Sequence, residues 1–269
     1  MFGSVATLES NTLNEEEYQG CLTARERQQL AGFSNENRRK KWLAGRMAGK
    51  YLYLSRSVEG QFQSGLAEQV SFLELTQDHL RSFAPRLYRD VEILPDAGSQ
   101  GNIPRIRTQA DVMTGFCNIS ISHTDYLSCA YLTHSSSVGI DLERATSRIG
   151  SFYHINFTCS ETGWVRKTAC ACDVSMLWLY TVLWSLKESV LKSDHSREAS
   201  LWRIPSVEVS VQTEKVNWKK LYEHETLGAE FLFLTIAFNN QSKDRRARVA
   251  LTATRHLILV IGELEGKAS

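Results

Sequence analysis

An apolar helix that ends in charged residues is the feature of this chain that most limits how it can fold. Residues 174–192 show helical periodicity with Asp173 or Ser175 as the N-cap, and the turns over residues 177–186 are apolar nearly all round. Such a helix needs cover on most of its surface, so we expect it to be buried for much of its length. The apolar run at residues 176–186 is too short to cross a bilayer.

Alternating patterns predict short strands on both sides of this helix. Between residues 116 and 143, apolar residues such as Ile119 and Ile121 alternate with small or polar ones. The last third of the chain, from residue 207 to residue 261, alternates in the same way. The segment at residues 95–106 contains Gly and Pro and is predicted to be a loop.

Two further helices are predicted near the N-terminus. Thr23 and Glu26 have the spacing of a capping box, which opens a helix that ends near Leu30. A second helix is expected over residues 35–54, where apolar residues recur at helical spacing and form one buried stripe. Residues 152–166 have a less regular pattern.

The order of these elements predicts an α+β protein. Helices followed by strands occur twice along the chain, which indicates two similar halves, although no sequence repeat is clear. We place the halves at residues 1–135 and 136–269. A chain of 269 residues is long enough for one large domain or for two halves of about 130 residues each.

Composition narrows the class of protein further. A hydrophobic content of 42% and a charged content of 23% are ordinary for a soluble globular protein. The formal net charge of +1 provides no overall field to attract nucleic acid or a membrane, so any recognition of anions must be local. The second predicted helix holds one local concentration of basic residues, of which four are expected to lie largely off its apolar stripe: Arg38, Arg39, Arg46 and Lys50.

Cysteine usage and the N-terminus indicate a cytoplasmic protein. The cysteines are scattered, and the Cys170-Ala171-Cys172 spacing is not that of a usual zinc site. We therefore expect reduced thiols. Residues 1–17 lack a basic region followed by an apolar run, so no export signal is visible.

Three carboxylates form the first group of candidate functional residues. Asp141 and Glu143 are two apart in a predicted strand and therefore point to the same face, although a solvated strand end beside Arg144 would explain this pair alone. Glu188 and Lys192 are four apart and lie on one helix face, where a surface ion pair is the ordinary alternative. Charges on a buried helix need partners, and carboxylate oxygens suit a hard divalent cation such as Mg²⁺.

A histidine and two arginines form the second group. His123 follows a predicted strand, next to Ser122, and Arg38 and Arg46 lie on the second predicted helix, within about a quarter-turn of each other. Each residue alone has a structural explanation. Together with the three carboxylates, in this order along the chain, they suggest chemistry on a phosphate ester.

In this order the segments resemble the signature blocks of the Sfp-type 4′-phosphopantetheinyl transferases. Residues 139–143, Gly-Ile-Asp-Leu-Glu, are similar to the family's Gly-[Ile/Val]-Asp-x-Glu block. Residues 184–192, Trp-Ser-Leu-Lys-Glu-Ser-Val-Leu-Lys, fit its Trp-[Ser/Thr]-x-Lys-Glu-[Ser/Ala]-x-x-Lys block without a mismatch. Residues 118–123 resemble its histidine block, residues 38–46 its arginine-containing helix, and residues 157–161 its Phe-x-x-x-Glu segment.

The chain departs from the family pattern at three places. The family usually has Gly-Lys-Pro before the histidine block, whereas residues 101–105 read Gly-Asn-Ile-Pro-Arg, so that Arg105 or Arg107 is the candidate replacement for the lysine. The histidine block has an extra Ser-Ile before Ser122. No glycine follows Lys192 within a few residues. These differences bear on the pantetheine channel and carrier specificity more than on the metal site.

The resemblance implies both a fold and an activity. The fold would consist of two similar α/β halves related by a pseudo-twofold axis, with the active site at their interface, in a monomer. The activity would be the Mg²⁺-dependent transfer of the 4′-phosphopantetheine moiety of coenzyme A to a serine of an apo acyl or peptidyl carrier protein. Adenosine 3′,5′-bisphosphate would be released.

The resemblance also implies a role for each candidate residue. Asp141, Glu143 and Glu188 would be the metal ligands, and Glu188 would also accept the serine proton, directly or through a water. The catalytic residues would be Glu188, Lys192, which stabilises the leaving phosphate, and His123, which donates to a phosphate. The contacts to coenzyme A are assigned to Arg38, Arg46, Ser122, His123 and Lys192, with the two arginines on the 3′-phosphate.

Two alternatives to an active transferase remain open at this point. A non-catalytic module that binds coenzyme A is suggested by the missing loop lysine. A metal-dependent phosphoester hydrolase would use the same cation but pass the group to water. The presence of all three carboxylates and Lys192 favours the transferase over the binding module.

Overall fold

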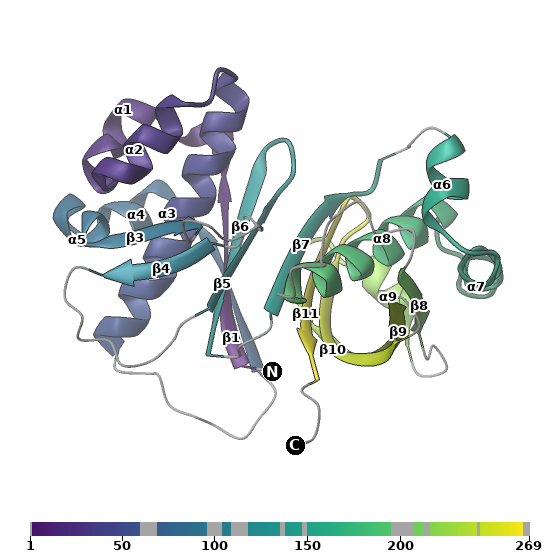
Figure 1. The fold of residues 1–269 in the computed structure, drawn as a ribbon. Coiled ribbons are helices and arrows are strands. Elements are labelled where there is room, and N and C mark those ends of the chain that lie inside the picture. The colour runs from purple at the N-terminus through teal and green to yellow at the C-terminus, as the bar shows by residue number, and fades with distance from the viewer. Residues whose placement is uncertain are drawn as a thin grey trace. The chain divides into compact units, whose positions relative to one another are not determined.

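The computed structural model of the chain contains two compact units, Met1–Ser136 and Ser137–Ser269 (Figure 1). Each unit has its own sheet and its own apolar core. The mixture of helices and sheets confirms the predicted α+β class. The structure describes residues 2–59, 69–95, 104–108, 118–134, 138–146, 150–194, 207–211, 216–240 and 243–265.

The sheet of unit 1 has the strand order β2-β1-β6-β5-β4-β3. Strands β1 and β2 run parallel, and the other neighbouring pairs are antiparallel. Strands β5 and β6 are consecutive, and His123 at the end of β5 pairs with Ser128. The strands are β1 (Phe2–Glu9), β2 (Gln69–Leu75), β3 (Val91–Pro95), β4 (Pro104–Thr108), β5 (Asn118–His123) and β6 (Leu127–Thr133).

The central helix of unit 1 is α3 (Glu36–Glu59), which packs on strands β1, β5 and β6. It is longer than the predicted helix, and Trp42, Leu43 and Met47 of the predicted stripe are buried. The shorter elements around it are α1 (Glu15–Tyr18), α2 (Ala24–Ala31), α4 (Gln77–Arg81), α5 (Pro85–Arg89) and the 3₁₀ turns η1 (Ser10–Thr12) and η2 (Gln19–Cys21).

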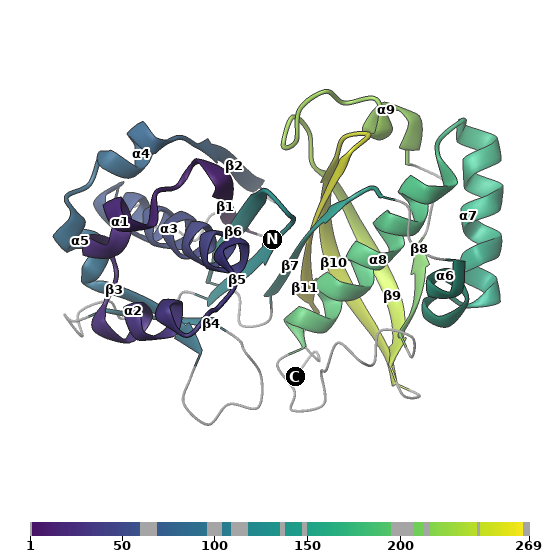
Figure 2. The same ribbon diagram turned by 90° about the horizontal axis from the view of Figure 1, so that it is seen from above.

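The sheet of unit 2 is antiparallel throughout and has the strand order β7-β11-β10-β9-β8. Helix α8 (Met176–Ser193) lies along one face of this sheet and packs on β7 and β11 (Figure 2). The strands are β7 (Val138–Arg144), β8 (Val207–Val211), β9 (Leu232–Asn240), β10 (Lys243–Ala253) and β11 (Leu257–Leu264).

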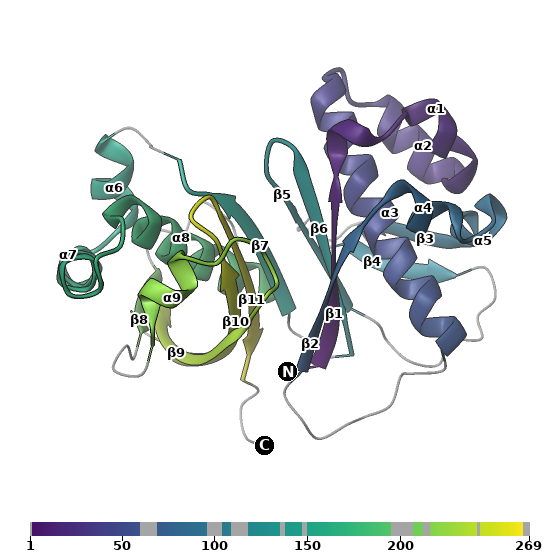
Figure 3. The same cartoon turned by 180° about the vertical axis from the view of Figure 1, so that it is seen from behind.

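Three shorter helices surround α8. Helix α7 (Cys159–Cys172) packs against it (Figure 3). Trp218 of α9 (Trp218–Tyr222) contacts Trp178 of α8, with ring centroids 6.2 Å apart. Helix α6 (Gly150–Asn156) precedes α7. The α8 backbone is therefore covered by sheet and helices, as its apolar sequence predicted.

The two sheets share one order of strands. Without β2, the sheet of unit 1 reads β1-β6-β5-β4-β3, and the sheet of unit 2 reads β7-β11-β10-β9-β8. Each order starts at the first strand, moves to the last and then returns through the others in reverse. The two units therefore use the same connections between strands, although their sequences show no clear repeat.

A buried ion pair ties the elements of unit 1 together. The Nζ atom of Lys50 lies 2.6 Å from Oε2 of Glu26, and both side chains are fully buried. Glu26 also completes the capping box of α2 with Thr23, and its Oε1 accepts the Ile93 N–H. The expectation that Lys50 and Arg46 lie off the buried stripe is wrong, because α2, η2 and β3 cover that side of α3 and supply polar partners.

Unit 2 contains the same arrangement. The Nζ atom of Lys187 on α8 lies 2.8 Å from Oε2 of Glu161 on α7, again with both side chains buried. Glu161 completes a capping box with Thr158, and its Oε1 accepts the N–H of Val209 on β8. Helix, capping box and strand are thus joined through one glutamate in each unit.

Several predicted boundaries need correction. Residues 152–156 belong to α6 and residues 159–166 to α7, and the pattern looks irregular because two separate helices meet here, so that no single period runs through them. Ser175 is the N-cap of α8, whereas Asp173 ends α7 with a left-handed φ of 53°. Residues 104–106 belong to strand β4 rather than to a loop, and residues 96–103 lie outside the described part.

Within the described part of the chain, no helix combines the length and the apolar character that a membrane span requires.

Candidate functional site

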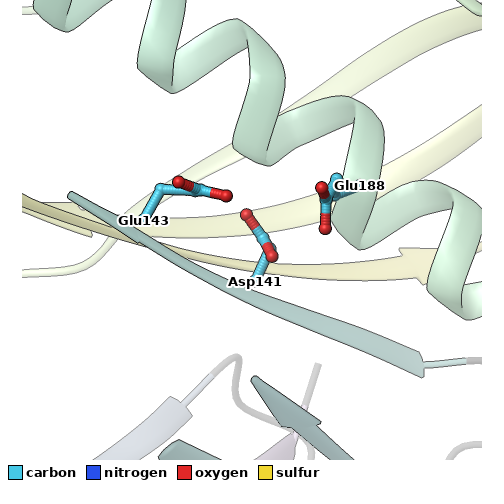
Figure 4. A group of neighbouring side chains, drawn as sticks. All are labelled: Asp141, Glu143 and Glu188. Atoms are coloured by element: carbon cyan, nitrogen blue, oxygen red, sulfur yellow. The ribbon is translucent and has the colours of Figure 1, made fainter. Parts of the chain in front are cut away.

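Three carboxylates from two elements meet in unit 2. Asp141 and Glu143 lie on β7, and Glu188 lies on the facing side of α8 (Figure 4). Each offers one oxygen atom to a group in which all the oxygens lie within 4.8 Å of one another. Among the described residues, this is the group of His, Cys, Asp and Glu side chains whose arrangement can hold a metal ion.

The local structure explains why they converge. Asp141 and Glu143 share one face of β7 because successive strand residues alternate, while Leu142 between them is buried in the core. Glu188 faces them because α8 packs directly on β7 and β11. The Asp141 carboxylate is buried, and those of Glu143 and Glu188 are half-buried.

Lys192 supplies positive charge to this group. One helical turn after Glu188, its Nζ atom lies 2.7 Å from Oδ1 of Asp141 and 3.1 Å from Oε2 of Glu188. Burial lowers the pKa of Lys192, but Asp141 and Glu188 together outweigh this effect and raise the pKa overall. Lys192 is therefore a firmly charged ammonium group between two carboxylates.

Glu188 has a raised pKa in this cluster. Burial and the neighbouring Asp141 raise its pKa from 4.5 to about 8, although Lys192 acts in the opposite direction. The carboxylate form is therefore disfavoured while no further cation is near. A divalent cation among the three oxygens would relieve this repulsion.

Two further side chains hold the carboxylates in place. Ser185 Oγ donates to Oδ2 of Asp141 at 2.8 Å, and Trp184 Nε1 donates to Oε1 of Glu143 at 3.1 Å. The sequence reasoning assigned no role to either residue. Their spacing of three and four residues before Glu188 puts them on the same face of α8, and that spacing is the signal that could have identified them.

Lys187 has a structural role that the sequence did not reveal. It follows Leu186 and precedes Glu188, but its side chain points to the other side of α8, where it is paired with Glu161 and donates to the Asn156 carbonyl at 2.7 Å. Burial lowers the pKa of Lys187, whereas the neighbouring Glu161 acts to raise it. Lys187 and Glu188 are neighbours in the sequence, but their side chains therefore lie on different sides of α8 and have different partners.

The arginine candidates lie in unit 1 on neighbouring aromatic rings. The Arg38 guanidinium lies 4.8 Å from the centroid of the Phe33 ring, and that of Arg46 lies 4.5 Å from the Trp42 ring. Arg38 is exposed, whereas Arg46 is buried and donates from Nε to the Ile93 carbonyl at 3.1 Å. Burial lowers the pKa of Arg46 to about 10, with Glu26 opposing this shift.

The remaining candidates also lie in unit 1. His123 is exposed at the end of β5, and Ser122 before it is buried. Of the two candidates for the missing loop lysine, Arg105 Nη1 lies 2.5 Å from the amide oxygen of Asn118, and Arg107 lies 3.5 Å from Glu92. The structure thus brings Asp141, Glu143, Glu188 and Lys192 together in unit 2, while Arg38, Arg46, Ser122 and His123 belong to unit 1.

Comparison with known families adds a second kind of observation. Residues 137–250 match the sequence model of the 4′-phosphopantetheinyl transferase superfamily. The matched region lies within unit 2. The matched residues include all three carboxylates and Lys192, and they extend from the start of β7 into β10. No curated protein matches the chain.

Members of the phosphopantetheinyl transferase superfamily are typically Mg²⁺-dependent, and the residues of this domain fit such an ion. All three candidate ligands offer carboxylate oxygen, which a hard cation prefers. Asp141, Glu143 and Glu188 carry up to three negative charges against one positive charge on Lys192. This excess suits a divalent cation.

Proposed function

We propose that this protein is a 4′-phosphopantetheinyl transferase that activates carrier proteins. Its substrates would be coenzyme A and an apo acyl or peptidyl carrier protein, and its products the holo carrier protein and adenosine 3′,5′-bisphosphate. The observation that carries the proposal is the meeting of Asp141, Glu143, Glu188 and Lys192 within the domain that matches the superfamily.

The reaction joins the carrier serine to the β-phosphorus of coenzyme A. The serine oxygen forms a bond to that phosphorus, and the bond from the phosphorus to the oxygen shared with the α-phosphate breaks. The electron pair of that bond stays on the leaving adenosine 3′,5′-bisphosphate. When bound, Mg²⁺ neutralises phosphate charge and aligns the phosphates.

Residues of unit 2 perform the remaining tasks at the phosphates. Asp141, Glu143 and Glu188 hold the cation, and Glu188 also accepts the serine proton, directly or through a water. Lys192 stabilises the negative charge that grows on the leaving phosphate. Its position between Asp141 and Glu188 supports this role, because it already lies beside the proposed cation site.

Residues of unit 1 are assigned to coenzyme A. His123 donates to a phosphate with Ser122 beside it, and Arg38 and Arg46 bind the 3′-phosphate, for which the guanidinium fork is well shaped. The aromatic rings under both guanidinium groups support this assignment, since they hold the two arginines in defined positions. The proposal therefore draws on both units, in the pseudo-twofold arrangement that the family resemblance implies.

The test is a transfer assay with labelled coenzyme A and a panel of apo carrier proteins, with and without Mg²⁺. We expect a Mg²⁺-dependent gain of mass, equal to one phosphopantetheine group, on at least one carrier. Release of phosphopantetheine to water without a carrier would identify a hydrolase instead. Binding of coenzyme A without any turnover would identify a non-catalytic module.

A further inference from the structure

Two paired glycines lie under helix α8 at the carboxylate cluster. Gly139 of β7 and Gly262 of β11 face each other across the two strands, and α8 passes over both at Ser189. A Cβ atom on Gly139 would overlap the Ser189 carbonyl oxygen and would lie 2.7 Å from Cβ of Lys192. The backbone of α8 therefore rests directly on the sheet at this point.

The contact at Gly262 is tight, but it is less close than the contact at Gly139. A Cβ atom there would lie 3.1 Å from Ser189 Oγ and 3.2 Å from the Ser189 carbonyl carbon. To accept a methyl group at Gly262, the helix must move away from the sheet by a few tenths of an ångström. Since Ser189 directly follows Glu188, this movement would carry the Glu188 carboxylate with it.

The spacing between α8 and the sheet sets the size of the proposed cation site. Asp141 and Glu143 are fixed on the sheet, whereas Glu188 is fixed on the helix. Mg²⁺ requires near-ideal octahedral geometry at about 2.0–2.1 Å, but Ca²⁺ accepts flexible coordination at about 2.3–2.6 Å. The difference between the two ions is thus as large as the movement that one methyl group at Gly262 would cause.

We propose that Gly262 is a positioning residue that holds α8 close enough to the sheet for the carboxylates to favour Mg²⁺ over Ca²⁺. The inference rests on the proposed function, because it assumes that the cluster binds a divalent cation. Unit 1 places glycine differently. There Gly49 lies on helix α3, and a Cβ on it would lie 2.5 Å from Cδ1 of Ile119 and 2.9 Å from Cδ1 of Ile93, both side chains of the sheet.

This contrast provides a matched control. Gly262→Ala and Gly49→Ala each add one methyl group to a tight contact between a helix and a sheet, but only the first contact adjoins the carboxylates. Gly163→Ala is a second control, since no atom lies within 4 Å of its Cβ position. Ser189→Thr adds a methyl group to the contact between Gly262 and Ser189 from the helix side. It is the alternative variant if Gly262→Ala does not fold.

The measurement is Mn²⁺ binding to the full chain by paramagnetic resonance, with Mg²⁺ and Ca²⁺ as competitors, after circular dichroism has shown that each variant is folded. For Gly262→Ala we expect Mg²⁺ affinity to fall about tenfold, as for other residues that support metal ligands, while Ca²⁺ affinity changes little. Ser189→Thr should shift the ratio in the same direction. Both glycine controls should keep the ratio of the original protein.

Two results would overturn the inference. An unchanged ratio of Mg²⁺ to Ca²⁺ affinity in folded Gly262→Ala or Ser189→Thr would refute the positioning role while leaving the transferase proposal intact. Absence of any Mn²⁺ binding by the original protein would refute the cation site itself, and the positioning role with it.

Discussion

At the scale of single residues, the ion pair between Lys192 and Asp141 is the most consequential contact of the cluster. A lysine that lies 2.7 Å from one carboxylate and 3.1 Å from another partly neutralises three acidic groups. The neutralisation is incomplete, since the pKa of Glu188 is still raised to about 8. The protein therefore keeps a local excess of negative charge next to one cation, and this excess makes its stability sensitive to pH.

The raised pKa of Glu188 predicts how stability depends on pH without metal. Glu188 binds its proton more tightly in the folded chain than in the unfolded one, so stability should fall as pH rises from about 4.5 to about 8. We expect the free energy of unfolding to drop by about 2–4 kcal/mol over this window, and Glu188→Gln to lack this loss. Urea denaturation at both ends of the window measures it. Equal losses in the two proteins would contradict the assignment.

Arg38 allows a clean test of binding to the 3′-phosphate, because it is exposed and Arg46 is buried. Arg38→Ala should leave stability nearly unchanged and raise the KM for coenzyme A about tenfold, the effect of losing one hydrogen bond to a charged group. Steady-state kinetics with coenzyme A lacking the 3′-phosphate provides the control. If the variant loses as much with that analogue, Arg38 does not bind the 3′-phosphate.

At the scale of helices and strands, each unit is organised around one buried glutamate. Glu161 accepts from Lys187 on α8, from the backbone of Val209 on β8 and from its own capping box. A carboxylate with this many partners is satisfied in the core, but it becomes costly as soon as its cation is removed. The helix that carries Glu188 is thus held from its other side by Lys187.

Removal of the Lys187 charge should therefore destabilise the protein strongly. Lys187→Met keeps most of the side-chain volume but leaves Glu161 buried without its cation, which we expect to lower the free energy of unfolding by about 3–5 kcal/mol. Lys219→Met, which removes an exposed pair with Asp173, is the control and should have little effect. Denaturant unfolding compares the two. A small change in Lys187→Met would contradict the expected cost of leaving Glu161 buried without its cation.

At the scale of the whole molecule, two units with the same order of strands carry different chemical groups. Unit 2 presents carboxylates on its long helix and on the strand beneath it, whereas unit 1 presents arginines on its long helix and a histidine at a strand end. The proposed division of labour between cation and coenzyme A can be tested directly.

His123→Ala and Asp141→Asn should separate the two tasks. We expect His123→Ala to lower kcat/KM about 10–100-fold, the cost of one charge-assisted hydrogen bond, while Mn²⁺ binding stays unchanged. Asp141→Asn should abolish both transfer and Mn²⁺ binding and remain folded. Transfer assays and paramagnetic resonance on the same samples compare them. Near-normal transfer by Asp141→Asn would refute the metal assignment.

Much of the fold could be predicted because it depends on local periodicity. The capping boxes, the buried helix α8 and the alternating strands each follow from residues close together in sequence. The shared face of Asp141 and Glu143 follows likewise from the period of a strand. The superfamily match over residues 137–250 agrees with the resemblance of these local blocks.

The sequence by itself therefore determined helices α2, α3 and α8 and the shared face of Asp141 and Glu143. Only the tertiary structure decided that Lys187 pairs with Glu161, that Glu188 lies beside Asp141, and that Gly262 lies under Ser189. The reason is physical: periodicity is set by a residue's neighbours along the chain. Burial and pairing are set instead by which distant element packs against it.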